Sequence, residues 1–214
     1  MLQYKTKFIL IGCVICMAWT TAGSGPQEKS VRVAPGFTLK NVDGRMIQLK
    51  PFMGRIIVLE WMHPDCTFVK SNYSNDTKDS IRNLRKKYAD ENIVWLSINS
   101  NKDATEENNK QWAEKFNLEY VLLDADGTVG RLYGATKNHE IFIIDKKGNI
   151  VYQGGVDNAP LGILLDTKEG YINYLDLALK QLTRNQPVKI SRSYPFCCLI
   201  KYASPTVVVD GQQP

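Results

Sequence analysis

Short apolar runs alternate with amphipathic stretches along most of the chain, and this alternation predicts an α/β fold. Continuous apolar runs over 56–59 and 93–98 are typical of strands buried on both faces of a sheet. Apolar side chains recur at helical spacing over 81–88 and 171–182, which predicts a helix in each range. The other predicted elements are a hairpin over 37–49, a helix that begins at or near Cys66, a helix over 104–116, a strand over 121–123 and a hairpin over 141–152. We therefore expect a central mixed β-sheet flanked by helices.

The first 22 residues have the three-part pattern of a secretory signal peptide. Lys5 and Lys7 precede an apolar stretch over 8–19, and small residues follow it. That stretch is shorter than the roughly 20 residues that a membrane-spanning helix needs. A retained anchor and a lipoprotein site at Cys13 are the weaker alternatives. We predict a signal peptide over 1–22, hence a periplasmic or otherwise extracytoplasmic protein with no stable membrane span after cleavage.

The rest of the chain divides into three parts. A polar, aperiodic stretch over 23–34 is interpreted as a linker. Residues 35–186 hold the alternating elements and are long enough for one domain with its own core. Residues 187–214 are too short for a second domain, so we interpret them as a C-terminal tail that carries Cys197 and Cys198.

Charge excludes one class of partner. The net charge is +5, and removal of the two lysines of the signal peptide lowers it to +3. Acidic and basic residues are interspersed, and the densest basic cluster, 85–87, is interpreted as the solvated face of a helix. We therefore expect no nucleic-acid partner.

The cysteines are more informative about function than the net charge. Cys13 and Cys16 lie in the predicted signal peptide, which leaves Cys66, Cys197 and Cys198 in the mature chain. An exported protein enters a compartment where disulfides persist. An odd number of cysteines fits a reactive site better than a framework of structural disulfides.

Cys66 is the leading candidate for chemistry. It follows a buried strand and a short loop and stands where a helix begins. Unpaired backbone N–H groups and the positive end of the helix dipole favour the thiolate there, and the thiolate is the nucleophilic form of sulfur. The alternative is an inert buried cysteine.

The order and spacing of several segments resemble one family, the redoxin branch of the thioredoxin fold named after alkyl hydroperoxide reductase and thiol-specific antioxidant proteins. The resemblance extends over roughly residues 35–202. The segments are 37–39 with 43–44, 58–61, Pro64-Asp65-Cys66-Thr67-Phe68-Val69-Lys70, 95–100, 122–130, 133–135, 141–145 and 198–202. The resemblance implies a thioredoxin-like fold and a thiol oxidoreductase without a cofactor.

By this resemblance Cys66 matches the active-site cysteine, and Trp61 and Pro64 are expected to line the site before it. Cys198 resembles a tail cysteine that resolves the oxidised nucleophile, with Cys197 as the other candidate. The implied substrates are protein thiols and disulfides or peroxides, with an external reductant, which includes antioxidant activity.

Three positions depart from the family pattern. Val69 stands where thioredoxin-type reductants have their second cysteine, and His63 stands where typical peroxiredoxins have Thr or Ser. His139 stands where the fold usually has a cis-proline facing the active site, so we expect it to line the site as well.

Two alternatives to redox chemistry stay open. Cys66 and His139 are good ligands for copper or zinc, and His63, Cys197 or Cys198 could complete such a site. That arrangement would resemble the Sco-type metallochaperones, which share the fold. The other alternative is an interaction domain in which Cys66 is not redox-active.

Overall fold

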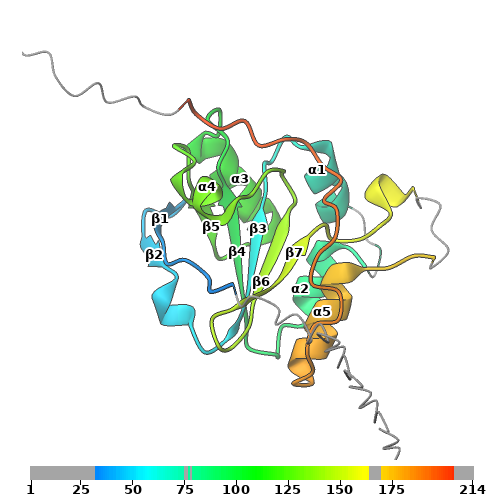
Figure 1. Ribbon diagram of the computed structural model, residues 1–214. Helices are drawn as coiled ribbons and strands as arrows, with labels where there is room; N and C mark the ends of the chain where they lie inside the picture. The colour runs from blue at the N-terminus through cyan, green and yellow to red at the C-terminus, as the bar shows by residue number, and fades with distance from the viewer. Residues whose placement is uncertain (1–31, 75–76, 78, 164–169, 205–214) are drawn as a thin grey trace, which may run out of the picture. The chain divides into compact units, whose positions relative to one another are not determined.

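A computed structural model of the protein describes residues 32–74, 77, 79–163 and 170–204. Its seven strands form one mixed sheet in the order β2-β1-β5-β4-β3-β6-β7 (Figure 1). The predicted signal peptide, 1–22, lies outside the described residues. Within the part of the chain that the structure describes, no helix is long and apolar enough to cross a membrane.

The elements follow the order that the sequence pattern predicts. The strands are β1 Thr38–Asn41, β2 Met46–Gln48, β3 Ile56–Trp61, β4 Ile93–Asn99, β5 Val121–Leu123, β6 Ile141–Ile144 and β7 Ile150–Gly154. The helices are η1 Lys50–Phe52, α1 Thr67–Ser74, α2 Ile81–Lys87, α3 Glu106–Phe116, α4 Thr128–Tyr133, η2 Pro160–Gly162 and α5 Tyr174–Thr183. The predicted α/β class and mixed sheet are confirmed.

Strand β3 is central and places the candidate site. It pairs in parallel with β4 and antiparallel with β6, and all six of its residues are buried. Successive side chains of a strand point to opposite faces. Ile56 and Val58 accordingly join the apolar cluster that contains Cys66, whereas Ile57, Leu59 and Trp61 join the cluster on the other face.

Helices cover the two faces unequally. The Cys66 face is packed by side chains from α1, α2, α3 and α5. The opposite face is packed by the β1–β2 hairpin, by Val129 and Tyr133 of α4, and by Ile200 of the tail. Both clusters exclude water from the sheet, so β3 holds the Cys66 loop in a fixed place.

One predicted helix begins later than expected, and one observed helix was not predicted. The last helix begins at Tyr174, three residues after Tyr171, because the Asn173 side chain caps it by accepting the Asp176 N–H at 2.7 Å. Helix α4 was not predicted. Its six residues follow a turn, and Asp124 accepts the Val129 and Gly130 N–H groups from its first turns.

The tail returns to the domain. From the end of α5 it runs back along α1 toward α3 and α4 (Figure 1). Its backbone forms hydrogen bonds with β7 and with residues 136–138. In one of them, the Asn138 N–H donates to Cys198 O at 2.8 Å. At the other end of the domain, Ala34 N–H donates to Gly148 O at 2.9 Å, so residues that we assigned to the linker contact the β6–β7 turn.

Candidate active site

Cys66 caps the N-terminus of α1. Its carbonyl accepts the Lys70 N–H at 2.9 Å, and its own N–H donates to His63 O at 3.0 Å. The side chain is 5% exposed. Asp65, the acidic neighbour, is paired with Lys70 at 3.1 Å, and this pairing lowers the pKa of the Asp65 carboxyl. The strand–loop–helix order predicted from the sequence therefore presents a cysteine at a helix start.

Two tail sulfurs meet Cys66 there. The Sγ atoms of Cys66 and Cys198 are 3.0 Å apart, and those of Cys66 and Cys197 are 3.3 Å apart. All three are free thiols. Cys66 is buried, Cys197 is partly buried and Cys198 is exposed. The structure thus brings Cys66 together with two tail cysteines that lie more than a hundred residues away in the sequence.

Hydrogen bonds from the two tail thiols stabilise the thiolate form of Cys66. The hydrogen bond from Cys197 is the largest cause that lowers the pKa of the Cys66 thiol, to about 4, with further bonds from Cys198 and from the Val69 N–H. Burial opposes this shift but does not cancel it. The bond to Cys66, together with burial, raises the pKa of Cys197. At neutral pH the site therefore holds one thiolate, on Cys66, and two protonated thiols.

Alkylation of Cys66 should report this arrangement. We expect its rate with iodoacetamide to level off above a midpoint near pH 4 in the native protein, because only the thiolate reacts. In Cys197→Ala the midpoint should rise by about one pH unit or more, since the main hydrogen bond to the thiolate is lost. Cys198→Ala is the matched variant and should raise the midpoint less. Mass spectrometry of the Cys66 peptide gives the rates, and equal midpoints in all three proteins would contradict the assignment.

Two glycines of the domain pack closely against the tail, one against a residue before Cys197 and Cys198 in the sequence and one against a residue after them. Upstream, Gly154 lies so close to the tail that a Cβ there would be 2.6 Å from Ser193 O and 2.7 Å from Ser193 N. Downstream, a Cβ at Gly130 would lie 2.8 Å from a ring carbon of Tyr202, whose hydroxyl donates to Ala135 O at 2.7 Å. Real Cβ atoms do not approach this closely, so the tail fits only against glycine.

A methyl group at Gly154 should therefore displace the tail. We expect Gly154→Ala to lower the free energy of unfolding by about 1–3 kcal/mol, the usual cost of overpacking. It should also slow disulfide formation between Cys66 and the tail. Gly36→Ala is the matched control, because no atom lies within 4 Å of its added Cβ. Urea unfolding and thiol counting measure the two effects, and similar behaviour of the two variants would contradict a tight tail contact.

His139 lies in the interior beside the site. It precedes β6 with a φ of +72°, which is uncommon for a residue other than glycine. Its backbone N–H donates to Trp61 O. Burial lowers the pKa of its imidazole. Its Nε2 faces Glu60 Oε1 at 3.5 Å, and neither atom makes a hydrogen bond with the described residues.

Sequence reasoning missed the buried charges behind His139. Glu60 is fully buried on β3, and its Oε2 accepts from Tyr73 at 2.7 Å, from Arg85 at 2.8 Å and from Ser97 at 3.1 Å. The interpretation of Arg85 as part of a solvated helix face is wrong, because its side chain turns inward to this carboxylate and is 15% exposed. The available signal was a single acidic residue within an apolar strand.

The other predicted site residues are spread out. Pro64 is buried in the loop before Cys66. Trp61 is not at the Cys66 site: strand alternation directs it to the other face, where its Nε1 donates to Ser100 Oγ at 3.0 Å. His63 accepts the Asp65 N–H at 2.9 Å and faces Asp103 at 3.3 Å.

The geometry gives the metal-binding alternative no support. Among the described residues, no three His, Cys, Asp or Glu side chains are arranged to hold a metal ion. The imidazole of His139 faces Glu60 rather than completing a ligand set with the cysteines.

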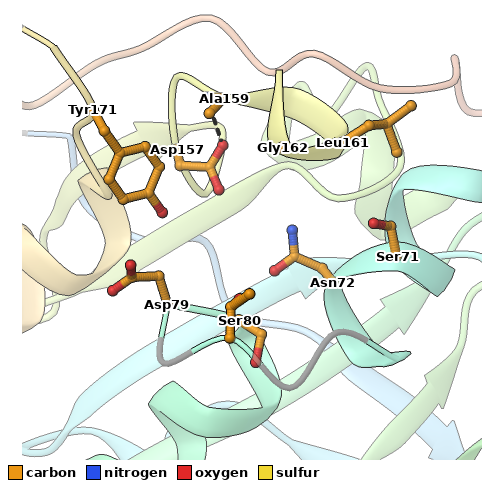
Figure 2. Close-up of a pocket in the computed structure, with 10 residues that line it drawn as sticks. Ser71, Asn72, Asp79, Ser80, Asp157, Ala159, Leu161, Gly162 and Tyr171 are labelled. Atoms are coloured by element: carbon orange, nitrogen blue, oxygen red, sulfur yellow. Dashed lines mark hydrogen bonds between the residues drawn. The ribbon is translucent and has the colours of Figure 1, made fainter. Parts of the chain in front are cut away.

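A cavity opens beside α1. It has a volume of about 330 Å³ and lies between α1, the start of α2 and the segment after β7 (Figure 2). Asp79, Asp157 and Tyr171 supply polar groups to its wall. A smaller cavity shares Asn72, Asp157 and Leu161 with it and is also lined by Phe68, His139 and Phe196. The two cavities together extend from the surface to residues next to the cysteines.

Comparisons with known proteins identify the family of this chain. The AhpC/TSA family profile matches residues 31–153. The chloroplastic peroxiredoxin Q of Triticum aestivum is 29% identical over 128 residues, which cover 56% of this chain and 56% of that protein. The thiol-disulfide oxidoreductase ResA of Bacillus thuringiensis subsp. konkukian is 24% identical over 158 residues, covering 71% of this chain and 86% of that protein. The chain thus spans just over half the length of the Triticum aestivum relative.

Solved structures share the fold. An uncharacterized conserved protein from Geobacillus kaustophilus has a TM-score of 0.69 at 26% identity, over 81% of this chain and 92% of that chain. A putative thiol:disulfide interchange protein DsbE from Chlorobium tepidum has a TM-score of 0.53 at 18% identity, over 72% of this chain and 95% of that chain. The expected thioredoxin-like fold is confirmed. Since the family profile matches more than half of its residues, this chain belongs to the AhpC/TSA family.

Proposed function

We propose that this protein is an exported thiol oxidoreductase in which Cys66 is the nucleophile and Cys198 resolves its oxidised form. The observation that supports the proposal best is the contact of two tail sulfurs with Cys66, at 3.0 and 3.3 Å. A disulfide bond is about 2.05 Å long, so closure from 3.0 Å needs a movement of about 1 Å. The tail needs no large rearrangement to reach the nucleophile.

Both substrate classes lead to the same product. With a peroxide, the Cys66 thiolate attacks one oxygen, the O–O bond breaks, and protonation of the leaving oxygen gives an alcohol or water beside a Cys66 sulfenic acid. Cys198 then attacks the Cys66 sulfur and water leaves. With a disulfide, Cys66 forms a mixed disulfide and releases one thiolate, and attack by Cys198 releases the second. An external thiol reductant resets the pair.

The relatives support redox chemistry without choosing the substrate. One named relative is a peroxiredoxin and another is a thiol-disulfide oxidoreductase. Such proteins act on peroxides or on protein thiols and disulfides, and we propose the same classes for this chain. The thiolate on Cys66 fits either electrophile.

A stoichiometric titration tests the function and selects the substrate. The reduced full chain is mixed with one equivalent of hydrogen peroxide or of a disulfide-bonded peptide. The free thiols of the protein alone are then counted over time by alkylation and mass spectrometry, because exchange with the peptide releases two peptide thiols for every two protein thiols that are oxidised. We expect two of the three thiols of Cys66, Cys197 and Cys198 to be lost per equivalent of oxidant, with Cys66 in the resulting disulfide. The faster oxidant identifies the substrate class. If Cys66 stays free with both oxidants, the proposal is wrong.

The export part of the proposal depends on the N-terminal pattern. Lys5, Lys7 and the apolar stretch over 8–19 have the arrangement of a signal peptide. An oxidising compartment also suits a pair of thiols that cycles through a disulfide. N-terminal sequencing of the mature protein tests cleavage near residue 22.

A further inference from the structure

The two tail cysteines differ in surroundings although both contact Cys66. Cys197 is partly buried and packs against the apolar cluster that contains Cys66, whereas Cys198 is exposed. Side chains of neighbouring residues in an extended chain point to opposite sides. Here the chain bends at Cys197, and both sulfurs reach the same partner. Cys66 therefore has two candidate partners for a disulfide, an inner one, Cys197, and an outer one, Cys198.

The tail pair is poorly suited to bond with itself. Cα atoms of consecutive residues are about 3.8 Å apart across a trans peptide, and disulfides usually join Cα atoms about 4.4–6.8 Å apart. No cis peptide bond occurs between described residues. Both tail thiols are thus left available to Cys66 rather than to each other.

We propose, building on the function above, that Cys66 forms two alternative disulfides, an outer one with Cys198 and an inner one with Cys197, which interconvert by internal exchange. In the exchange the Cys197 sulfur attacks Cys66 Sγ, the Cys66–Cys198 bond breaks, and its electron pair leaves on Cys198. The proton of Cys197 passes to Cys198. One S–S bond forms and one breaks, so no outside oxidant or reductant takes part.

Oxidation itself prepares Cys197 for this step. In the reduced protein, the hydrogen bond to Cys66 is the largest cause of the raised pKa of the Cys197 thiol. Once Cys66 is in a disulfide, it is no longer a thiolate, so that cause disappears. The Cys197 thiol then ionises more readily, at a separation of 3.3 Å from Cys66 Sγ.

The two disulfides should differ in access to a partner. In the outer form an exposed sulfur, that of Cys198, can be attacked by a protein dithiol. In the inner form both bonded sulfurs are at least partly covered, and Cys198 is a free thiol at the surface. The ratio of the two forms then sets how fast a protein reductant restores Cys66, whereas a small reductant is less affected.

Disulfide mapping of three proteins tests the inference. The full chain, Cys197→Ser and Cys198→Ser are oxidised with one equivalent of hydrogen peroxide, quenched in acid, alkylated and digested. Peptides with Cys13 and Cys16 are scored separately. We expect Cys66–Cys198 in Cys197→Ser, Cys66–Cys197 in Cys198→Ser, and both in the unsubstituted chain. Oxidised Cys198→Ser should be reduced about tenfold more slowly than Cys197→Ser by a protein dithiol, with similar rates for dithiothreitol.

The outcomes separate this inference from the function on which it rests. If Cys66 of Cys198→Ser stops at the sulfenic acid, trapped with dimedone, while Cys197 is recovered as a free, alkylated thiol, the inner disulfide does not form and the inference is wrong, although Cys66–Cys198 chemistry stands. If Cys66 remains a free thiol in all three proteins, the proposed function fails and the inference fails with it. Equal reduction of both variants by the protein dithiol would overturn the difference in access.

Discussion

Replacement of Cys66 by serine should lower turnover with either substrate class about a thousandfold or more, the scale seen when a catalytic nucleophile is removed. The serine hydroxyl is far less acidic than a thiol whose pKa is lowered to about 4, so it supplies almost no anion at neutral pH. It also forms no stable bond to sulfur. The measurement is the rate of thiol oxidation in the presence of a reductant, with peroxide and with a disulfide peptide.

The double variant Cys197→Ser/Cys198→Ser is the matched control for that result. It keeps the nucleophile but loses both candidate resolving thiols. We expect it to react once with substrate at a measurable rate and then to stop as a mixed disulfide or as oxidised Cys66. Turnover by Cys66→Ser within tenfold of the unsubstituted chain would show that another group is the nucleophile.

The chain pattern was sufficient to predict the framework of this site. The buried run over 56–59, the short loop and the helix that follows are local features, and each is specified by residues close in sequence. Continuous apolar runs predicted β3 and β4, and Cys66 is at the start of α1 as expected. Local periodicity is informative here because both strands are buried on two faces.

The contacts across the fold could not be obtained in the same way. Periodicity carries no information on which loop a tail will reach, so a link between Cys198 and Cys66 followed only from the family resemblance. The simultaneous contact of Cys197 depends on a bend in an irregular segment. From the sequence, we expected the N-terminus of a helix to stabilise the Cys66 thiolate. In the structure, the hydrogen bond from Cys197 is the larger cause of the lowered pKa of Cys66.

The buried ion pair between Arg85 and Glu60 also could not be predicted from the sequence pattern. Arg85 lies in a run of basic residues on an amphipathic helix, and such runs are usually solvated. Only the position of Glu60 on the facing strand shows that this one side chain turns inward. Pairing of this kind depends on the rotation of α2 against the sheet, which the sequence pattern leaves undetermined.

Loss of Arg85 should destabilise the fold more than loss of any surface cation. In Arg85→Met, the fully buried Glu60 carboxylate would lose its cationic partner. Breaking one side of a buried ion pair costs about 3–5 kcal/mol, because the remaining charge stays uncompensated in the interior. We expect a loss of that size in the free energy of unfolding, measured by urea denaturation at neutral pH.

Lys40→Met is the matched control, since it removes a cation from an exposed pair with Glu106, whose side chains are 47% and 52% exposed. Exposed pairs contribute about 0–1 kcal/mol, so this variant should remain close to the unsubstituted chain. Adding Glu60→Gln to Arg85→Met should restore part of the lost stability, because the amide is uncharged yet still accepts from Tyr73 and Ser97. A double variant less stable than Arg85→Met would mean that the carboxylate itself, rather than its missing partner, is what the interior requires.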